Sequence, residues 1–332
     1  YDFDYLIFIG RFQPFHHGHE FIVREALVRA KQVILLIGSA NSPRTIKNPF
    51  TFAERKAMIL QSFDTATAKR LICLPIDDTL YNDHKWLHNI RSTVNIATKS
   101  SPKHKIGVIG HTKDDSSYYL SLFPDWAYLE LPNFQNLSAT PLRQAYFGQA
   151  DSELYQKMPA ASAEFLQQFR HSHDFVRLQN EFHHINDYRQ SFHHLPYPPI
   201  FVTTDALVVQ SGHILLIERG GEYGNGLWAL PGGFLDENET LLQGVLRELK
   251  EETSLSLSQH DLKSTHTFDA PERSLRARTL TTVFHFVPPH RTLPTVQGND
   301  DAKQAFWLPL DELDGERMFE DHYSIITKIL GL

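Results

Sequence analysis

The sequence contains little cysteine and carries no excess of positive charge, and each absence limits what the protein can be. Cys73 is the one cysteine among 332 residues, so no disulfide can form within the chain, and a reducing, cytosolic setting is favoured. The formal net charge is -7 at pH 7. This balance argues against a broad basic surface of the kind that binds nucleic acid or anionic membranes.

Long apolar runs are also missing. The longest, around residues 33–37 and 206–209, are far too short to span a bilayer, and residues 1–8 lack the basic region and long apolar core of an export signal. We therefore expect a soluble, cytoplasmic protein with no membrane partner and no nucleic-acid partner. The sequence leaves a homo-oligomer open.

The chain is long enough for two domains. Its 332 residues are 41% hydrophobic, which is enough to fill two ordinary cores, and its two halves share no repeated motif. The run Leu195-Pro-Tyr-Pro-Pro199 breaks helical structure. We predict a first domain over residues 1–185, a linker over 186–199 and a second domain over 200–332.

Strands and helices alternate in the first domain. Short apolar runs are typical of strands that are covered on both faces of a parallel sheet, and they occur at residues 5–9, 33–37, 71–76, 106–109 and 127–131. Helical spacing follows the first run and recurs at residues 52–63 and 84–98. This pattern predicts an α/β fold with a doubly wound parallel sheet, which binds ligands at the carboxyl ends of its strands.

The second domain has a different pattern. Strands are predicted at residues 201–209, 213–218 and 279–287, and one amphipathic helix interrupts them. This arrangement predicts an α+β fold.

A segment rich in glycine and histidine, Gly10-Arg-Phe-Gln-Pro-Phe-His-His-Gly-His19, follows the first strand. His16 and His19 are three residues apart, so both imidazoles can reach the first turn of a helix that begins near residue 17. A helix N-terminus presents unpaired N–H groups and partial positive charge, and the glycines let the backbone approach a triphosphate. An isolated pair of histidines more often caps a helix or packs in the core than binds phosphate, so the surrounding residues must decide between these roles.

The whole segment resembles the H-x-G-H nucleotidyltransferase superfamily and, within it, the nicotinamide mononucleotide adenylyltransferases of archaeal type. Three later segments agree in the same order: Asn48-Pro-Phe-Thr-Phe-Ala-Glu-Arg55, Asp78 ahead of Trp86, and Ser138-Ala-Thr-Pro-Leu-Arg143. Two positions depart from the family. Ala139 occupies the middle of its second motif, and Lys47 stands where some relatives have arginine.

The resemblance implies that the 5′-phosphate of nicotinamide mononucleotide attacks the α-phosphorus of ATP, giving NAD and pyrophosphate. It implies catalytic contacts with phosphate for His16, His19 and Arg143, and Mg2+ on the leaving pyrophosphate. The other ATP- or substrate-binding residues that it implies are Gly10, Arg11, Phe12, Gln13, Lys47, Asp78, Trp86, Ser138 and Thr140.

Three side chains in this domain keep two interpretations. Trp86 either stacks on the nicotinamide ring or is an ordinary core tryptophan. Arg55 is either structural or functional. His111, in the segment Gly110-His-Thr-Lys-Asp-Asp115, either faces the same site or lies on a surface loop.

A second candidate site lies on the predicted helix of the second domain. Thr240-x-x-Gln243 is a capping box that starts this helix. Glu248, Glu251 and Glu252 lie at i, i+3 and i+4, so their carboxylates converge within one turn. Like charges this close repel one another unless a cation lies between them, and oxygen ligands suit Mg2+ or Mn2+. A solvated acidic helix face is the alternative for this pattern alone.

The surrounding residues resemble the Nudix box, G-x5-E-x7-R-E-U-x-E-E-x-G-U, in which U is bulky and apolar. The matching residues are Gly233, Glu239, Arg247, Glu248, Leu249, Glu251, Glu252 and Leu255. Ser254 replaces the glycine of the family at the position where the helix ends. Serine in the left-handed conformation that ends a helix costs some stability, but the replacement of glycine by serine removes no metal ligand.

This resemblance implies metal-assisted hydrolysis of a nucleoside diphosphate linked to another group, with the three glutamates as catalytic metal ligands. The segment Asp269-Ala-Pro-Glu-Arg273, with Arg276 and Arg278 nearby, is similar to the substrate loop of Nudix domains that act on ADP-ribose. The implied products are AMP and ribose 5-phosphate, and Arg273 is the implied substrate ligand. A basic surface loop is the alternative, and the general base is not identified.

Together, the two domains resemble the bacterial bifunctional nicotinamide mononucleotide adenylyltransferase/Nudix proteins. We therefore expect an enzyme of NAD metabolism whose small-molecule partners are ATP, nicotinamide mononucleotide, NAD and ADP-ribose. Two alternatives stay open. The second domain is a non-catalytic sensor of ADP-ribose or NAD, or the first domain uses nicotinate mononucleotide as its acceptor.

Overall fold

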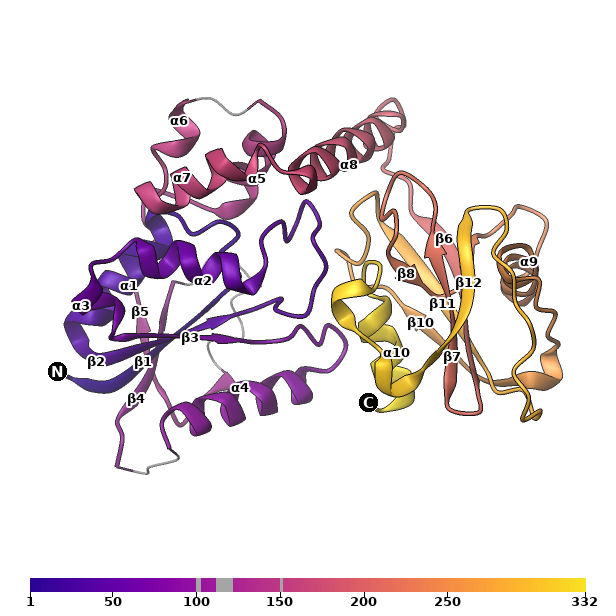
Figure 1. Ribbon diagram of the computed structural model, residues 1–332, viewed down its shortest axis with the longest axis horizontal. Helices are drawn as coiled ribbons and strands as arrows, with labels where there is room; N and C mark the ends of the chain where they lie inside the picture. The colour runs from indigo at the N-terminus through magenta and orange to yellow at the C-terminus, as the bar shows by residue number, and fades with distance from the viewer. Residues whose placement is uncertain (100–102, 112–121, 150–151) are drawn as a thin grey trace. The chain divides into compact units, whose positions relative to one another are not determined.

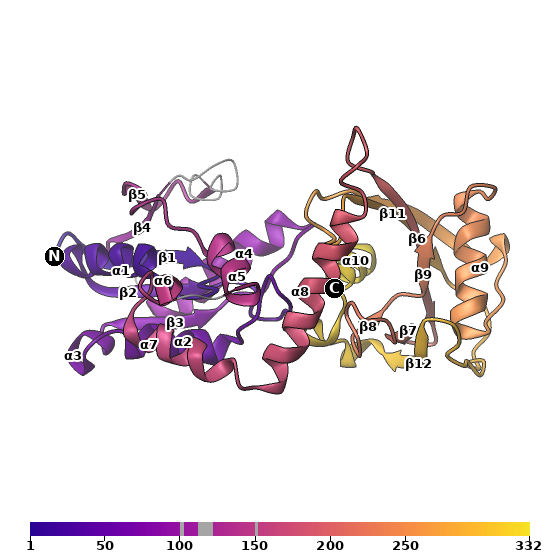
Figure 2. The ribbon, with the colours of Figure 1, turned by 90° about the horizontal axis from the view of Figure 1, so that it is seen from above.

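Two separate sheets organise the chain, one within Tyr1–Asn180 and the other within Glu181–Leu332 (Figures 1 and 2). The computed structural model describes residues 1–99, 103–111, 122–149 and 152–332. Helix α8 (His173–Gln190) contributes residues to both units. The domain boundaries at 185 and 199 stay predictions. Across the described ranges, no helix is long and apolar enough to cross a membrane.

The first unit confirms the predicted doubly wound sheet. Its strands are all parallel and lie in the order β3-β2-β1-β4-β5. Their bounds are β1 Phe3–Gly10, β2 Ala30–Ile37, β3 Leu71–Pro75, β4 Ile106–Gly110 and β5 Ala127–Glu130. The chain runs outward from β1 through β2 and β3 on one side and through β4 and β5 on the other. The carboxyl ends of β1 and β4 therefore mark the switch point at which such sheets bind ligands.

Helices cover both faces of this sheet (Figure 1). The helices of this unit are α1 His17–Arg29, α2 Phe52–Gln61, α3 Thr65–Ala68, α4 Asp83–Ala97, α5 Ala139–Phe147, α6 Ser152–Tyr155 and α7 Ala160–Phe169, followed by α8. Helix α4 lies on the opposite face from α2, and its Ile90 and Val94 pack with Ile7, Ile34 and Val108 of the strands. The apolar runs of the sequence are thus buried, as expected for a parallel sheet.

The second unit has a mixed sheet in the order β10-β11-β6-β7-β12, to which β8 and β9 are added at β7 and β6. Strands β6 and β11 are parallel, and the other pairs are antiparallel. The bounds are β6 Phe201–Gln210, β7 His213–Arg219, β8 Trp228–Ala229, β9 Gly232–Phe234, β10 Leu262–Phe268, β11 Thr279–Phe286 and β12 Ala302–Pro309.

Two α-helices accompany this sheet, α9 (Leu241–Thr253) and α10 (His322–Leu330), where the sequence predicted one. Helix α10 was missed because it is short and the chain before it alternates turns and single apolar residues. Helix α9 begins at the predicted capping box and packs Val245 and Leu249 on Ala206, Phe284 and neighbouring apolar residues. The α+β class is confirmed, with one helix more than expected.

Candidate active sites

The loop after β1 and the first turn of α1 bring His16 and His19 together. His16 is the N-cap of α1, where its Nδ1 accepts a hydrogen bond from Gly18 N at 3.1 Å, and His19 Nδ1 accepts one from His16 N at 3.4 Å. The two rings stack with their centroids 3.7 Å apart. Nδ1 of each ring accepts a hydrogen bond, so in the neutral form of such a ring the proton lies on Nε2, the nitrogen that is able to donate to a phosphate oxygen. Capping and phosphate binding, which the sequence presents as alternatives, are therefore compatible.

His19 is neutral near pH 7. Its ring packs with Phe12 and Phe15, at centroid distances of 4.9 and 5.9 Å. Burial, and then the nearby charges of His16 and His111, lower the pKa of His19 well below its usual value. A neutral ring acts as a hydrogen-bond donor and not as a fixed cation. His111 therefore lies within electrostatic reach of His19.

Arg143 and Arg11 add positive charge at this site. Arg143, on α5, donates from Nη1 to Gln13 O at 2.8 Å and from Nη2 to Thr140 Oγ1 at 3.1 Å. Burial, and then the charge of Arg11, lowers the pKa of Arg143 to about 10. Two guanidinium groups this close repel each other, and an anion between them relieves that repulsion. The pair is suited to a phosphate group.

Arg55 has a structural role. It is 1% exposed, and its guanidinium donates four hydrogen bonds of 2.6 to 3.2 Å to backbone carbonyl groups. The acceptors are the carbonyl oxygens of Thr51, Arg11, Gly38 and Ser39. Arg55 thus joins the loops that follow β1 and β2, and the structural interpretation of this residue is supported.

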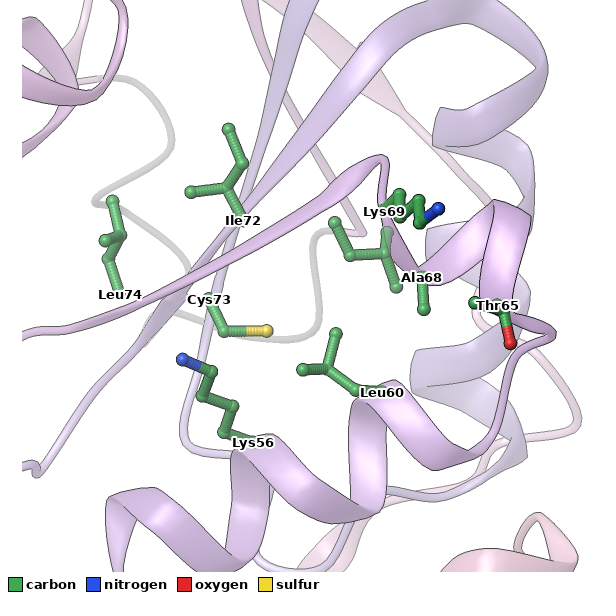
Figure 3. Close-up of a pocket in the computed structure, with 9 residues that line it drawn as sticks. Lys56, Leu60, Thr65, Ala68, Lys69, Ile72, Cys73 and Leu74 are labelled. Carbon is green, nitrogen blue, oxygen red and sulfur yellow. The ribbon is translucent and has the colours of Figure 1, made fainter.

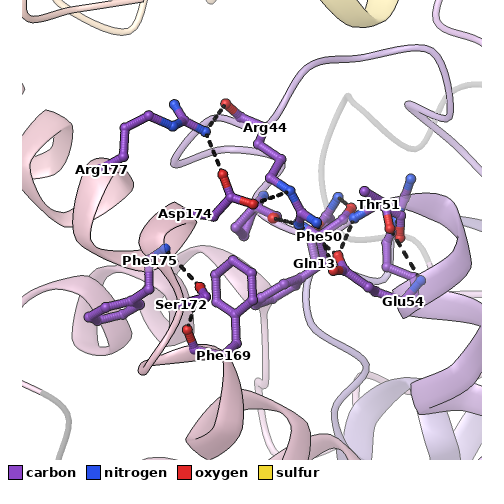
Figure 4. A network of polar contacts seen from close by, with 12 residues as sticks. Gln13, Arg44, Phe50, Thr51, Glu54, Phe169, Ser172, Asp174, Phe175 and Arg177 are labelled. Atoms are coloured by element: carbon purple, nitrogen blue, oxygen red, sulfur yellow. Dashed lines mark hydrogen bonds and ion pairs between the residues drawn. The ribbon is translucent and has the colours of Figure 1, made fainter.

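Gln13 is buried and holds the segment around Phe50 (Figure 4). Its Oε1 accepts a hydrogen bond from Phe50 N at 3.0 Å, and its Nε2 donates to Phe50 O at 2.8 Å. Both polar ends of the side chain are used in this way. Gln13 therefore serves the site through its backbone carbonyl, which Arg143 contacts, and through the position of the neighbouring loop.

Arg44 fixes the same loop from the other end (Figure 4). It donates to both carboxylate oxygens of Glu54 at 2.7 Å, pairs with Asp174 of α8 at 3.1 Å, and donates to Pro49 O at 2.8 Å. The segment that it closes carries Lys47, which is partly exposed. Sequence reasoning missed Arg44 because no motif marks it. The capping box between Thr51 and Glu54 is the one local signal that this loop is ordered.

The other predicted residues of the first unit lie around these loops. Asp78 Oδ1 accepts a hydrogen bond from Ser39 N at 3.1 Å. Trp86 packs partly on the core and remains partly exposed, which suits either interpretation of that residue. Ser138 is the N-cap of α5 without a side-chain cap hydrogen bond, and Thr140 is exposed in the first turn.

Gly10 and Phe12 shape the backbone of the first loop. A Cβ at Gly10 would lie 3.1 Å from the Phe12 ring, so glycine allows this ring to cover the end of β1. Phe12 is buried, which makes it a packing residue of the loop. Residues 112–115 of the segment that begins at Gly110 lie outside the described residues.

In the second unit, Arg247 of α9 donates hydrogen bonds to three acidic residues and forms a longer ion pair with Asp236 at 3.7 Å. Its Nε and Nη2 donate to Glu239 at 3.0 and 2.7 Å, and its Nη1 donates to Glu248 and to Glu251 at 2.9 Å each. The hydrogen bonds with Glu239 are the largest cause of the raised pKa of Arg247. Arg247 therefore offsets part of the repulsion among the carboxylates. Glu251 is directed to Arg247 and is half-exposed.

Glu248 and Glu252 approach the turn that precedes the helix. Glu252 is 5% exposed, and its Oε2 accepts a hydrogen bond from Gly232 N at 2.8 Å. A Cβ at Gly233 would lie 2.4 Å from Glu248 Oε1, so glycine is required for this close approach. Burial raises the pKa of Glu252 to about 8 against the opposing Gly232 hydrogen bond, and the charge of Glu248 adds to the rise. A cation beside these two carboxylates would favour their charged forms.

The donor set fits a hydrated divalent cation. Among the residues that the structure describes, no group of three or more His, Cys, Asp or Glu side chains could hold a metal ion by itself. Glu248 and Glu252 supply carboxylate oxygens at one place, whereas Glu251 is bonded to Arg247. Oxygen donors suit Mg2+ or Mn2+, and Mg2+ in particular usually keeps several waters. Water and substrate oxygens would complete such a site.

Arg273, which the sequence assigned to the substrate, has its guanidinium in the interior. It donates from Nε and Nη2 to the two carboxylate oxygens of Asp321 at 3.0 and 2.9 Å. The two side chains are only 3% and 4% exposed. Asp321 is the N-cap of α10, so this pair ties the predicted substrate loop to that helix. Arg276 of the same loop is partly exposed.

A pocket of about 550 Å3 lies beside the edge strand β3 and shares no residue with either site (Figure 3). Its lining includes Lys56, Leu60 and Cys73. Burial raises the pKa of the Cys73 thiol to about 12, so the thiol stays protonated at neutral pH. Because the thiolate is the nucleophilic form, this cysteine is not a reactive group.

Two family models match the chain. The cytidylyltransferase-like model matches residues 7–145, and the NUDIX domain model matches residues 200–329. The first match contains the histidine pair and Arg143, and the second contains α9 with its glutamates.

Individual proteins are similar to one or both halves. The nicotinamide/nicotinic acid mononucleotide adenylyltransferase of Acinetobacter baylyi is 42% identical over 183 residues, which are 55% of this chain and 95% of that protein. The nicotinamide-nucleotide adenylyltransferase of Thermococcus onnurineus is 32% identical over 49% of this chain and 82% of its own. A crystal structure from Francisella tularensis, of a bifunctional NMN adenylyltransferase/ADP ribose pyrophosphatase with AMP and a manganese ion, covers 99% of both chains at 37% identity and a TM-score of 0.91.

Proposed function

The chain belongs to the family of bifunctional NMN adenylyltransferase/ADP-ribose pyrophosphatases, and from this premise we propose that it catalyses both reactions. The first unit transfers AMP from ATP to nicotinamide mononucleotide, giving NAD and pyrophosphate. The second unit hydrolyses ADP-ribose to AMP and ribose 5-phosphate. The observation that carries the proposal is the similarity to the Francisella protein along 99% of both chains, with each motif on its own folded unit.

In the first unit, catalysis requires positioning and neutralisation of charge. The 5′-phosphate of the acceptor attacks the α-phosphorus of ATP, and pyrophosphate leaves. We assign Nε2–H of His16 and His19 to phosphate oxygens, and Arg11 and Arg143 to the charge that develops during transfer. Lys47 acts from the loop that Arg44 fixes. The backbone N–H groups at the start of α5, with Ser138 and Thr140, add neutral donors.

In the second unit, Glu248 and Glu252 would hold Mg2+ or Mn2+, and Glu251 would join them if a ligand displaces its bond with Arg247. Such a cation neutralises a diphosphate and activates water. The manganese ion of the Francisella structure supports the choice of a divalent cation. In this chain, Gly232 and Gly233 let the carboxylates of Glu252 and Glu248 come close to the turn. Burial keeps the Glu252 carboxylate poorly solvated, which favours a bound cation.

The assay that tests both reactions supplies ATP, nicotinamide mononucleotide and ADP-ribose with Mg2+ and follows each product. We expect NAD, AMP and ribose 5-phosphate. Glu252→Gln should lower ADP-ribose hydrolysis about 100-fold or more and leave NAD synthesis unchanged. A wild type that binds ADP-ribose without releasing AMP would identify the second unit as a sensor instead.

Nicotinate mononucleotide is a second candidate acceptor. The Acinetobacter relative, which is 42% identical, is named for both nicotinamide and nicotinic acid mononucleotide. Pyrophosphate release should be compared with each acceptor at equal concentration. No release with nicotinamide mononucleotide would contradict the proposed first reaction.

A further inference from the structure

Arg276 is held among three aromatic rings of the second unit. Its guanidinium carbon lies 6.0 Å from the ring centroid of Tyr188, 5.3 Å from that of Tyr223 and 5.4 Å from that of Phe234. Cations over aromatic faces at such distances are attracted by the ring quadrupole. Tyr188 belongs to the last turns of α8, whereas Phe234 is the last residue of β9. The rings therefore confine a flexible side chain from several sides.

Arg189, the next residue of α8, holds the backbone of the same loop. Its Nη2 donates to Leu275 O, and its Nε donates to Arg276 O at 3.3 Å. The residues between Arg273 and Arg278 form bends and irregular backbone without strand or helix hydrogen bonds of their own. Bonds from a helix to two successive carbonyl groups therefore determine where this loop presents its side chains.

The position of Arg276 connects it to the carboxylate site. Its ring partner Phe234 follows Gly233, where a Cβ would lie 2.4 Å from Glu248 Oε1. The carbonyl oxygen of Phe234 also accepts a hydrogen bond from Arg247 Nη2 at 3.2 Å. Arg276 thus brings a positive charge beside the carboxylate site. A guanidinium in this place suits the diphosphate that a cation on the carboxylates would neutralise.

We propose that Tyr188 and Arg189 are positioning residues for Arg276, and that Arg276 binds the diphosphate of the substrate in the second unit. The proposal rests on the proposed hydrolysis of ADP-ribose and adds residues to it. Both positioning residues precede the stretch 200–329 that the NUDIX domain model matches. The end of α8, which lies outside the matched stretch, therefore contributes to a site that lies within it.

The test uses the full chain with Arg189→Ala, Arg276→Ala and the double variant, in steady-state hydrolysis of ADP-ribose. We expect Arg276→Ala to raise KM about tenfold and Arg189→Ala to raise it about fivefold, with kcat within about twofold, because a contact with the ground state is lost. The double variant should match Arg276→Ala, since Arg189 acts through Arg276. Additive effects, or an unchanged KM in Arg189→Ala, would overturn the proposal.

Two matched controls separate positioning from stability. His184→Ala removes an exposed ion pair between the same helix and Glu222, 2.7 Å long, and should leave KM unchanged. Tyr188→Phe keeps the ring beneath Arg276 and should behave as wild type, whereas Tyr188→Leu should raise KM. An equal rise in His184→Ala and Arg189→Ala would show that any loosening of α8 has this effect, which contradicts a specific role for Arg189.

A binding measurement tests the positioning role even if the second unit does not hydrolyse ADP-ribose. ADP-ribose binding to the same variants is measured by calorimetry, which needs no turnover. Weaker binding in Arg189→Ala and Arg276→Ala, with a wild type that binds but does not cleave, would support the positioning role and reject the hydrolase. Equal binding by all variants would reject the positioning role. NAD synthesis by each preparation reports that the first unit is folded.

Discussion

Ser254 ends α9 with φ of 60° and ψ of 6°, in the left-handed region. This conformation costs a residue with a Cβ about 1–2 kcal/mol, and glycine adopts it freely. The serine hydroxyl recovers part of that cost because it accepts a hydrogen bond from Asn299 Nδ2 at 2.8 Å. The left-handed backbone explains why the family has glycine at this position, and the hydrogen bond from Asn299 partly compensates for serine here.

Replacing Ser254 by glycine should stabilise the second unit by about 0.5 to 1 kcal/mol, because relief of strain exceeds the loss of an exposed hydrogen bond. Hydrogen exchange of the last turn of α9, measured by mass spectrometry, should slow accordingly. Asn299→Ala removes this hydrogen bond, together with a longer one to Gln297 O, without changing the backbone strain at Ser254, and it should quicken exchange slightly. Faster exchange in Ser254→Gly would mean that the hydroxyl contributes more than the strain costs.

Arg55 shows how a buried cation can be a structural residue. Burial lowers its pKa to about 10, so it stays charged at pH 7, and four carbonyl groups satisfy its donors. Lysine cannot reproduce the planar fork that reaches these carbonyls.

Arg55→Lys should therefore destabilise the first unit by about 3 kcal/mol or more, since carbonyl groups and a buried charge lose partners. NAD synthesis should fall as the loops after β1 and β2 loosen. ADP-ribose hydrolysis, measured on the same sample at 25 °C, should remain within about twofold of wild type. A variant with full NAD synthesis and unchanged thermal unfolding would contradict this role.

At the scale of the element, β11 buries a titratable group. His285 is 4% exposed, and its Nε2 has no hydrogen-bond partner among the described residues. Burial, and then the charges of Lys263 and His266 on β10, lower the pKa of His285 to about 4. Between about pH 4 and 6.5, the unfolded chain thus binds a proton at this residue that the folded chain does not.

The stability of the second unit should therefore be complete above about pH 6.5 and fall as the pH drops toward 4. His285→Leu removes this contribution, so its urea midpoint should decline less than that of wild type between pH 7 and 5. His322, whose pKa burial also lowers, is present in both proteins and serves as a common background. Equal declines in the two proteins would show that His285 takes up its proton without loss of the fold.

Each unit carries its own core and its own set of assigned site residues. One core joins the parallel sheet to α4, and the other joins the mixed sheet to α9. The residues assigned to adenylyl transfer lie within Tyr1–Asn180, and those assigned to hydrolysis lie within Glu181–Leu332. The residues assigned to each reaction therefore come from one unit.

His16→Ala should consequently lower NAD synthesis about 100-fold, the usual effect of removing one donor from a developing charge. ADP-ribose hydrolysis by the same variant should not change. Both rates are measured in one reaction, so the hydrolase serves as the internal control. A parallel fall in the two activities would show that the units depend on each other.

Local patterns in the sequence predict the class of each half and most of its chemistry. Apolar runs such as residues 33–37 predict buried parallel strands because both of their faces must be covered, and the two motifs locate His16, Arg143 and the glutamates of α9. Capping at residue 240 and the left-handed end at Ser254 were also predictable, because both depend on local backbone geometry.

The partners of these side chains come from distant parts of the chain and are seen only in the fold. Arg55, Gln13 and Arg273 carry the same donors as a phosphate or substrate ligand, yet the fold buries them against carbonyl groups, a loop backbone and Asp321. Arg44 and Arg189 have no motif, and they matter because distant loops come within hydrogen-bond reach. Spacing along a chain fixes neighbours within a helix turn, whereas the burial and pairing of a charge depend on segments far apart in sequence.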